Sequence, residues 1–126
     1  MAVRGHRDIF AKDVAWADGS APGVRYARFL LDDGNPVTSP MVILSKFAPG
    51  SMVEPHTHGC NYLEYIIEGS QMVGKVNFTA GDVRWAAGGT GYGPIMVGPE
   101  GCTVIIVFQE AAKGNAIPLG KGAVRT

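Results

Sequence analysis

The chain has 126 residues, a length that suits one domain able to bury about two-thirds of the surface of its unfolded chain. Eleven Lys and Arg residues balance eleven Asp and Glu residues, so no basic excess points to nucleic acid or to an anionic membrane surface. Apolar residues make up 46% of the chain, and its 18 glycines and 8 prolines favour short strands joined by tight turns over helices.

The amino-terminal residues 1–8 are charged and no apolar segment follows them. We therefore expect neither a signal peptide nor a membrane-spanning helix, and we expect a cytoplasmic protein. His6 lies in this stretch and is expected to be solvated. Cys60 and Cys102 are too few for a disulfide framework, and a reducing compartment would keep both as thiols.

Residues 1–22 mix charged side chains with Gly, Ser and Pro, and they predict an irregular N-terminal arm. A β domain is expected to begin at residue 23, because residues 24–31 alternate between two faces as a strand with one partly wet face does. Turn-forming residues at 32–36 separate this strand from the apolar run 41–47, which we expect to be another strand.

The second half of the chain continues this pattern of short apolar runs and turns. Gly74 and Lys75 have the spacing of a two-residue hairpin turn, in which Gly supplies the positive backbone angle. Residues 113–126 lose periodicity and are expected to form an irregular tail, so the β domain spans residues 23–112. The regular spacing of strands and turns predicts an antiparallel sandwich or barrel. Its further strands are expected at residues 62–67, 71–73, 76–78, 83–86, 95–99 and 102–108.

His56 and His58 are separated by one residue and stand between a Pro-Gly turn and the strand-like run 62–67. Alternate side chains of an extended backbone point to the same face, so these two imidazoles can converge on one point. Neutral imidazole is a common ligand of divalent transition metals, including iron, manganese, zinc, nickel and copper. The sequence therefore indicates a metal-binding or catalytic cavity at this pair.

The surroundings of the pair resemble the first motif of the cupin family, which reads Gly, five residues, His-x-His, three or four residues, Glu, six residues, Gly. Gly50, the two histidines and Gly69 match this spacing, and residues 65–69 resemble the family's Tyr-Val-Leu-Glu-Gly strand end. The resemblance covers about residues 40–110. It implies an all-β fold, an antiparallel double-stranded β-helix or jelly-roll barrel.

The second cupin motif is matched by Gly81, Asp82 and Gly89. Three positions depart from the family's metal-binding pattern. They are the family's glutamate, its proline and its third histidine, which fall on Tyr62, Ala87 and Tyr92.

The resemblance implies a divalent transition metal held by His56 and His58, with Glu64 as the strongest candidate for a third protein ligand. Two alignments stay open. Either the preceding loop is longer and Glu64 fills the family's glutamate position, or Tyr62 fills it and Glu64 lies further along the cavity wall. Tyr62 and Tyr92 are expected to act on the reacting group as hydrogen-bond donors or proton carriers.

Other side chains near the expected site have less specific signals. Cys60 continues the alternation of the histidines and could bind a soft metal, but a small buried residue in a turn is the favoured interpretation. Arg25 is a candidate for binding an anionic substrate group if its face turns inward. Trp85, Met52 and Phe47 are expected to line the core or the cavity.

Two functions from different classes follow from these residues. The first is a metal-dependent cupin enzyme acting on a small organic molecule, of the dioxygenase, isomerase or lyase type. The alternative is a non-catalytic cupin that binds or senses a small molecule with a decayed metal site. A metal-free isomerase of sugar nucleotides ranks last, because two of the expected strands, 41–47 and 62–67, supply only Lys46 as a basic residue. The resemblance also implies a homodimer.

Overall fold

The computed structural model describes residues 5–119 and shows an antiparallel β structure with two short 3-10 helices in that range, η1 (Ala11–Asp13) and η2 (Ala111–Lys113). No helix in this range is long and apolar enough to cross a membrane. The strands are β1 (Ala17–Asp18), β2 (Val24–Leu30), β3 (Met41–Phe47), β4 (Met52–Val53), β5 (His56–Thr57), β6 (Tyr62–Val73), β7 (Val76–Thr79), β8 (Val83–Ala86), β9 (Ile95–Phe108) and β10 (Ile117–Pro118).

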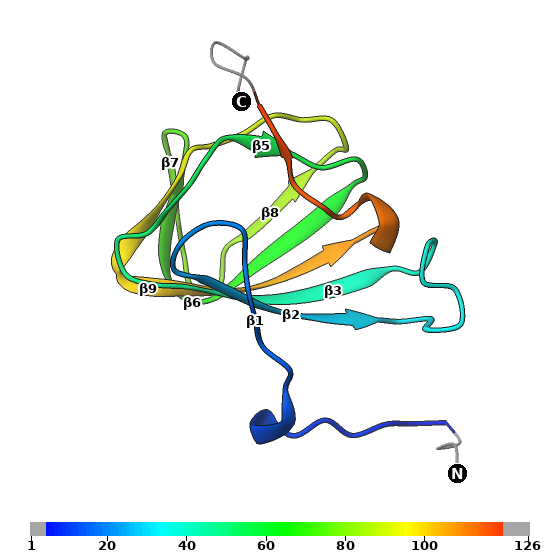
Figure 1. The fold of residues 1–126 in the computed structure, drawn as a ribbon. Coiled ribbons are helices and arrows are strands. Elements are labelled where there is room, and N and C mark those ends of the chain that lie inside the picture. Colours follow the sequence, from blue (N-terminus) through cyan, green and yellow to red (C-terminus); the bar gives the residue numbers. More distant parts are fainter. Residues whose placement is uncertain (1–4, 120–126) are drawn as a thin grey trace.

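Within the described part of the chain, eight strands form one sheet and two form another. The large sheet runs β1-β2-β3-β9-β6-β7, with β8 also pairing β6 and β4 also pairing β9. It curls from β2 and β3 through β9 and β6 up to β7 and β8, and the small β5–β10 sheet lies across from it (Figure 1). The all-β, antiparallel jelly-roll prediction is confirmed.

The core lies between the two walls of this curled sheet. β3 is central because it pairs residue for residue with β2 on one side and with β9 on the other. Alternate residues of β3, β6 and β9 point inward, which buries Met41, Ile66 and Phe108 almost completely. The run 41–47 is therefore a strand, as predicted, with the bounds expected from the sequence.

β6 is longer than expected, since the predicted strand 62–67 continues to Val73. Ile66 pairs with Val104 and Glu68 with Thr103, so Ile67 is an extra residue without a partner on β9. This β-bulge changes which residues face inward. Even-numbered residues from Tyr62 to Ile66 are buried before the bulge, whereas the odd-numbered Gln71 and Val73 are buried after it.

β9 is one strand where two were expected, at residues 95–99 and 102–108. Gly69 pairs with Cys102 and Gln71 with Val97, so residues 98–101 oppose Ser70 alone. The residues expected to form a turn therefore bulge out of a continuous strand. The backbones are so close here that a Cβ atom on Gly69 would collide with the carbonyl oxygen of Gly101.

The N-terminal segment, residues 5–16, leaves the sheet below β1 (Figure 1), lines a pocket together with β2, and is called the arm below. Arg7 pairs with Asp33 at 2.9 Å, whereas Ile9 and Phe10 are exposed. The expected limits of the arm and the tail stay predictions, because they include residues 1–4 and 120–126, which lie outside the described residues.

Candidate functional site

A cavity of about 590 Å³ lies inside the curled sheet. Its apolar wall comes mainly from β3 and β9 and includes Met41, Ile43, Phe47, Ile106 and Phe108. Its polar side chains include a group from β5 and the residue after it, from β6, from β8 and from the loop before β9, namely His56, His58, Tyr62, Glu64, Arg84 and Tyr92. Asp18, Tyr26, Arg28, Ser45 and Asn115 also line the cavity. The cavity therefore brings together all five predicted site residues and two arginines, Arg28 and Arg84.

His56 and His58 point to one place, as the alternation of an extended backbone requires. Both are buried, and their ring centroids lie 5.1 Å apart. The Nδ1 atom of His56 lies 2.9 Å from the carbonyl oxygen of Glu54, and that of His58 lies 2.9 Å from the carbonyl oxygen of Gly114. Since a carbonyl oxygen only accepts, each Nδ1 carries the proton and each Nε2 presents a lone pair.

Tyr92 lies between those two lone pairs. Its backbone pairs with that of His56 through hydrogen bonds of 3.0 and 3.1 Å, which fixes the position of its side chain. Its hydroxyl oxygen is 2.6 Å from Nε2 of His56 and 2.9 Å from Nε2 of His58. A phenol has one hydroxyl proton, so it can donate to only one of the two imidazoles at a time.

Burial keeps all three groups uncharged near neutral pH. It lowers the pKa of His56, and burial together with the neighbouring His56 lowers the pKa of His58 to about 4. Burial and the neighbouring Tyr62 raise the pKa of Tyr92. Two neutral imidazoles and a neutral phenol therefore share one mobile proton, and we call these three residues the histidine–tyrosine cluster.

Glu64 belongs to a separate arrangement, here called the ion-pair cluster, with Arg84 and Gln71. Glu64 and Arg84 are direct cross-strand partners on β6 and β8. The Oε1 atom of Glu64 accepts hydrogen bonds from Nη2 of Arg84 at 3.0 Å, from Nε of Arg84 at 3.2 Å and from Nε2 of Gln71 at 3.0 Å. The Oε2 atom accepts none of these bonds.

Arg84 also donates to the hydroxyl of Tyr62 at 3.1 Å, so each of its three nitrogens has an acceptor. Burial opposes the charge on Arg84, but the Glu64 carboxylate, Tyr62 and Tyr92 together outweigh this effect and raise the pKa of the guanidinium. Burial raises the pKa of Glu64, and Arg84 acts against that rise. The two opposite charges of this pair neutralise each other.

This geometry decides between the two open alignments. Tyr62 lies beside the histidines, with its ring centroid 4.9 Å from that of His58, and Glu64 lies further along the wall against Arg84. Among residues 5–119, no group of three or more His, Cys, Asp or Glu side chains could hold a metal ion. The residues present therefore do not fit the expected centre of His56, His58 and Glu64.

The sequence did not single out Arg84, the cavity arginine that pairs with Glu64. The candidate named instead, Arg25, is exposed and lies 5.8 Å from the ring of Trp16 on the outside. The expectation that Trp85 and Met52 line the core or the cavity is also wrong, since Trp85 is 63% exposed, Met52 is exposed as well, and neither lines the inner cavity. Phe47 is buried and does line it. The alternation of side chains along residues 83–86 could have identified Arg84 as a cavity residue, because it places Arg84 and Trp85 on opposite faces of the strand.

Cys60 is buried in a turn, and its thiol faces the carbonyl oxygens of Glu110 and Lys113 at 3.8 and 3.7 Å. It does not line the cavity that contains the histidines. The favoured interpretation of this cysteine, a small buried residue, therefore agrees with its environment.

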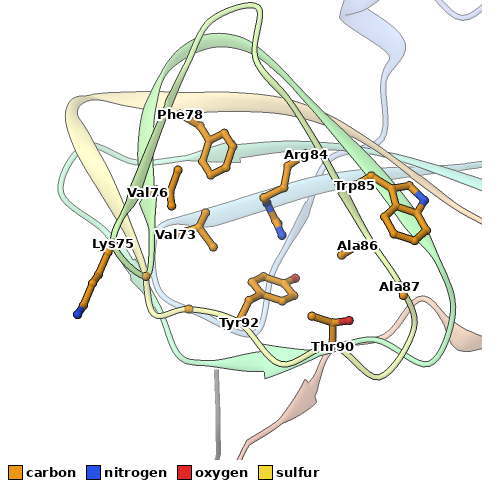
Figure 2. Close-up of a pocket in the computed structure, with 12 residues that line it drawn as sticks. Val73, Lys75, Val76, Phe78, Arg84, Trp85, Ala86, Ala87, Thr90 and Tyr92 are labelled. Carbon is orange, nitrogen blue, oxygen red and sulfur yellow. The ribbon is translucent and has the colours of Figure 1, made fainter. Parts of the chain in front are cut away.

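A second pocket, of about 730 Å³, lies between the β6–β7 hairpin and the loop that carries Tyr92. Figure 2 shows Arg84 pointing toward Tyr92, while Trp85 points away from it. Tyr92 and Arg84 line both this pocket and the inner cavity. These two side chains therefore separate the inner cavity from the second pocket.

No protein-family model and no curated protein sequence matches the chain. Solved structures do match it. The polyketide cyclase RemF from Streptomyces resistomycificus has a TM-score of 0.69 at 17% identity, covering 96% of this chain and 89% of RemF. An RmlC-like cupin from Shewanella frigidimarina has a TM-score of 0.68 at 20% identity, covering 86% of this chain and 93% of that one.

A variant of oxalate decarboxylase from Bacillus subtilis matches with a TM-score of 0.67 at 18% identity, covering 86% of this chain and 31% of that one. These proteins share the curled antiparallel sheet. The chain therefore has the fold of the RmlC-like cupins.

Proposed function

We propose that the protein is a cupin that binds a small organic molecule in the inner cavity and acts on it through the histidine–tyrosine cluster, by hydrogen bonding and proton transfer. The observation that carries this proposal is the hydroxyl of Tyr92, which lies within hydrogen-bond distance of both imidazole Nε2 atoms. Neighbouring structures named for a polyketide cyclase and an oxalate decarboxylase support action on small molecules and differ in their substrates.

The number of protons in the histidine–tyrosine cluster suggests how the cluster acts on a ligand. When the hydroxyl of Tyr92 donates to one histidine, the other Nε2 keeps a lone pair without a proton in the wall of the cavity. A ligand proton placed there meets a neutral base, because the pKa values of both histidines are lowered. The imidazole that takes the ligand proton becomes an imidazolium, and its new Nε2–H can donate to the hydroxyl oxygen of Tyr92 while the Tyr92 hydroxyl keeps donating to the other imidazole.

Ligand binding to matched variants tests this proposal. Tyr92→Phe removes the shared proton and keeps the ring, so we expect at least a tenfold loss of affinity for compounds found in a binding screen of the wild type. Tyr65→Phe is the control, because Tyr65 is exposed on the outer face of β6. Affinities are measured by calorimetry. Equal losses in the two variants, or none in either, would contradict a role for the cluster.

A metal-dependent enzyme is the second candidate, and the orientation of the histidines favours it. Metal-binding histidines commonly donate their other ring N–H to a carbonyl, as His56 and His58 do. The two Nε2 atoms and the hydroxyl of Tyr92 would hold an iron, manganese, zinc, nickel or copper ion, and Glu64 could join only after releasing Arg84. The ion would supply Lewis-acid chemistry to a substrate oxygen.

Elemental analysis of protein purified without an affinity tag separates the two candidates. A stoichiometric transition metal that is lost in the His56→Ala/His58→Ala double variant would establish the metal-dependent candidate. Absence of any stoichiometric metal, with ligand binding retained, is the result we expect. A non-catalytic binding protein is distinguished from both by mass spectrometry of the ligand after incubation, since it would return the ligand unchanged.

We also propose that the protein forms a homodimer through the outer face of β3, β9, β6 and β8. Strand register aligns two outer rows that contain only apolar residues. These rows are Val42, Val107, Leu63 and Trp85, followed by Leu44, Ile105, Tyr65 and Val83. Outer faces of antiparallel sheets are usually polar, so this face is suited to contact with another surface.

The arm supports a second copy of the chain as the occupant. Ile9 and Phe10 are exposed on the arm, so each copy has both exposed apolar side chains on the arm and an apolar outer face on the sheet. Light scattering after size-exclusion chromatography should give twice the monomer mass. Leu63→Glu/Trp85→Glu should give a monomer, whereas Val76→Glu, an exposed change at the β6–β7 hairpin, should not. A monomeric wild type would refute the proposed dimer.

A further inference from the structure

The inner cavity is lined by two arginines, and they differ in their partners. Arg84 is held by the carboxylate of Glu64, so its charge is already matched. Arg28 forms no ion pair with any residue in the range 5–119. The one hydrogen bond of its side chain in that range runs from Nε to the sulfur of Met41 at 3.3 Å, and a thioether is a weak acceptor. The two terminal nitrogens of Arg28 are therefore available to a ligand.

Strand register places the two arginines at opposite ends of one row of residues that line the cavity. Arg28 lies opposite Ile43 of β3, and Ile43 lies opposite Ile106 of β9. Ile106 lies opposite Glu64 of β6, which pairs with Arg84 of β8. Arg28 is exposed, whereas the side chains of Glu64 and Arg84 are 3% and 13% exposed. The row therefore runs from an unpaired cation at the open end, across two apolar side chains, to a buried ion pair.

The carboxylates of the cavity wall do not compete with a ligand for Arg28. Glu64 is already in an ion pair. Asp18 also lines the cavity, but it is the cross-strand partner of Arg25, and such partners point to the same face of a sheet. Since Arg25 lies on the outside beside a tryptophan ring, the register assigns the side chain of Asp18 to that outer face.

Arg28 also borders the pocket between the arm and β2. The carboxylates that line this pocket are Asp8, Asp13 and Asp33. None of them forms an ion pair with Arg28, and two of them pair instead with Arg7 and Lys12. The guanidinium of Arg28 is therefore unpaired on this side as well.

Ser45 supplies an unused donor on the same wall. It is the next inward-facing residue after Ile43 on β3, lines the cavity and is 5% exposed. Its hydroxyl makes no hydrogen bond to any residue in the range 5–119. Buried hydroxyl groups usually have a hydrogen-bond partner, so this one is suited to an acceptor on a ligand.

A continuous apolar surface connects Arg28 with the histidine–tyrosine cluster. Met41, which accepts the hydrogen bond from Arg28, is the cross-strand partner of Phe108. The ring centroid of Phe108 lies 4.9 Å from that of His58. Three strand spacings separate β2 from β6, about 14 Å along the curled sheet, so a straight path across the cavity is shorter. A single small molecule can therefore contact Arg28 and the cluster together.

We propose that the cavity binds a small carboxylate with an apolar or aromatic body, with the carboxylate held by Arg28 and the other end of the molecule at the histidine–tyrosine cluster. This proposal rests on the proposed function, because it specifies the ligand class of the same cavity. A carboxylate has only acceptors, and a guanidinium can meet its two oxygens with two parallel N–H donors. The apolar body would lie against Ile43, Met41 and Phe108.

The first test compares matched ligands on the wild-type protein. 3-(4-Hydroxyphenyl)propanoate and 3-(4-hydroxyphenyl)propanamide have nearly the same shape and differ in charge. Calorimetry should show binding of the carboxylate at least tenfold tighter than binding of the amide. Equal or tighter binding of the amide would overturn the inference and leave the proposed function standing.

A broad panel of carboxylates and neutral compounds covers the case in which neither of these two ligands binds. The tightest carboxylate of the panel and its amide then replace the first pair. Binding confined to neutral compounds would overturn the inference alone. No binding by any compound would overturn the proposed function itself.

The second test removes the charge from one residue. Arg28→Gln should weaken binding of the carboxylate at least tenfold and leave binding of the amide unchanged, whereas Arg28→Lys should retain part of the preference. Arg25→Gln is the matched control, because it removes an exposed cation from the outer face of the same strand. Loss of carboxylate binding in both Gln variants, or in neither, would overturn the assignment to Arg28.

Thermal unfolding with and without each ligand gives an independent measurement and shows whether the variants fold. The carboxylate should raise the melting temperature of the wild type and of the Arg25→Gln variant more than that of the Arg28→Gln variant. A folded Arg28→Gln variant that the carboxylate stabilises as much as it does the wild type would show that the carboxylate is bound elsewhere.

Discussion

The two polar clusters of the cavity lie side by side and differ in charge and in hydrogen bonding. The histidine–tyrosine cluster is uncharged, and a single hydroxyl proton serves two lone pairs. The ion-pair cluster carries a full positive and a full negative charge, and Oε1 of Glu64 alone accepts three hydrogen bonds. The histidine–tyrosine cluster has an Nε2 atom without a proton, so it can accept one from a ligand. The ion-pair cluster has no net charge and sets the electrostatic conditions in which that ligand binds.

The largest effect on stability should come from breaking the ion-pair cluster. Glu64→Ala leaves Arg84 buried without a counter-ion, and we expect the free energy of unfolding to fall by about 3–5 kcal/mol. The Glu64→Ala/Arg84→Met double variant removes both charges and should recover much of this loss. Urea denaturation measures all three proteins. A double variant as unstable as the single one would show that packing, not charge, dominates here.

The free energy of unfolding should depend on pH because of the histidines in the histidine–tyrosine cluster. The folded state holds the pKa of His58 at about 4, below the value of about 6.5 in an unfolded chain. Between these values the unfolded state binds a proton that the folded state does not, so stability falls as pH is lowered from 6.5 to 4. The loss should be on the order of 1–3 kcal/mol.

Chemical denaturation across this pH range provides the measurement. His58→Asn removes the titrating group and should flatten the slope. An unchanged slope in that variant would assign the pH dependence to other residues.

A smaller effect is expected when the shared hydroxyl is removed. Tyr92→Phe takes one donor from the histidine pair, and we expect a loss of about 1 kcal/mol in unfolding free energy, measured by urea denaturation. Nitrogen NMR of the histidine side chains should also change, because both Nε2 atoms lose their hydrogen-bond partner. Unchanged histidine signals would mean that the hydroxyl does not contact the pair in solution.

The smallest effect should come from an acidic residue of the same strand that faces outward. Glu68 is exposed, and its carboxylate accepts a 3.3 Å hydrogen bond from Thr103. Glu68→Gln should change the unfolding free energy by less than about 0.5 kcal/mol in the same urea experiment. A loss comparable to that of Glu64→Ala would mean that position on the strand, not burial of the pair, determines the cost.

Much of the fold could be predicted, because it depends on local patterns. The apolar run 41–47 gave the bounds of β3 correctly, and Gly74 with Lys75 marked the β6–β7 turn. Alternation alone placed His56 and His58 on one face, and it placed Glu64 and Tyr62 together on the inner face of β6.

The partners of these side chains could not be predicted in the same way. Glu64 meets Arg84 because β8 pairs with β6 in one particular register, and single-sequence patterns do not specify which residues of two strands lie opposite each other. Gln71 was missed for a different reason. Strict alternation from Tyr62 would point it outward, but the extra residue Ile67 brings it into the cavity beside Glu64.

Because of the bulge at Ile67, the effect of deleting one residue from β6 depends on where in the strand that residue lies. Deleting Ile67 would join Ile66 to Glu68 and keep every remaining residue of β6 opposite its present partner on β9. Deleting Leu63 would instead place Tyr62 on the solvent side and remove it from Arg84. Ile67 is thus the residue that β6 can lose while its inner surface keeps its composition.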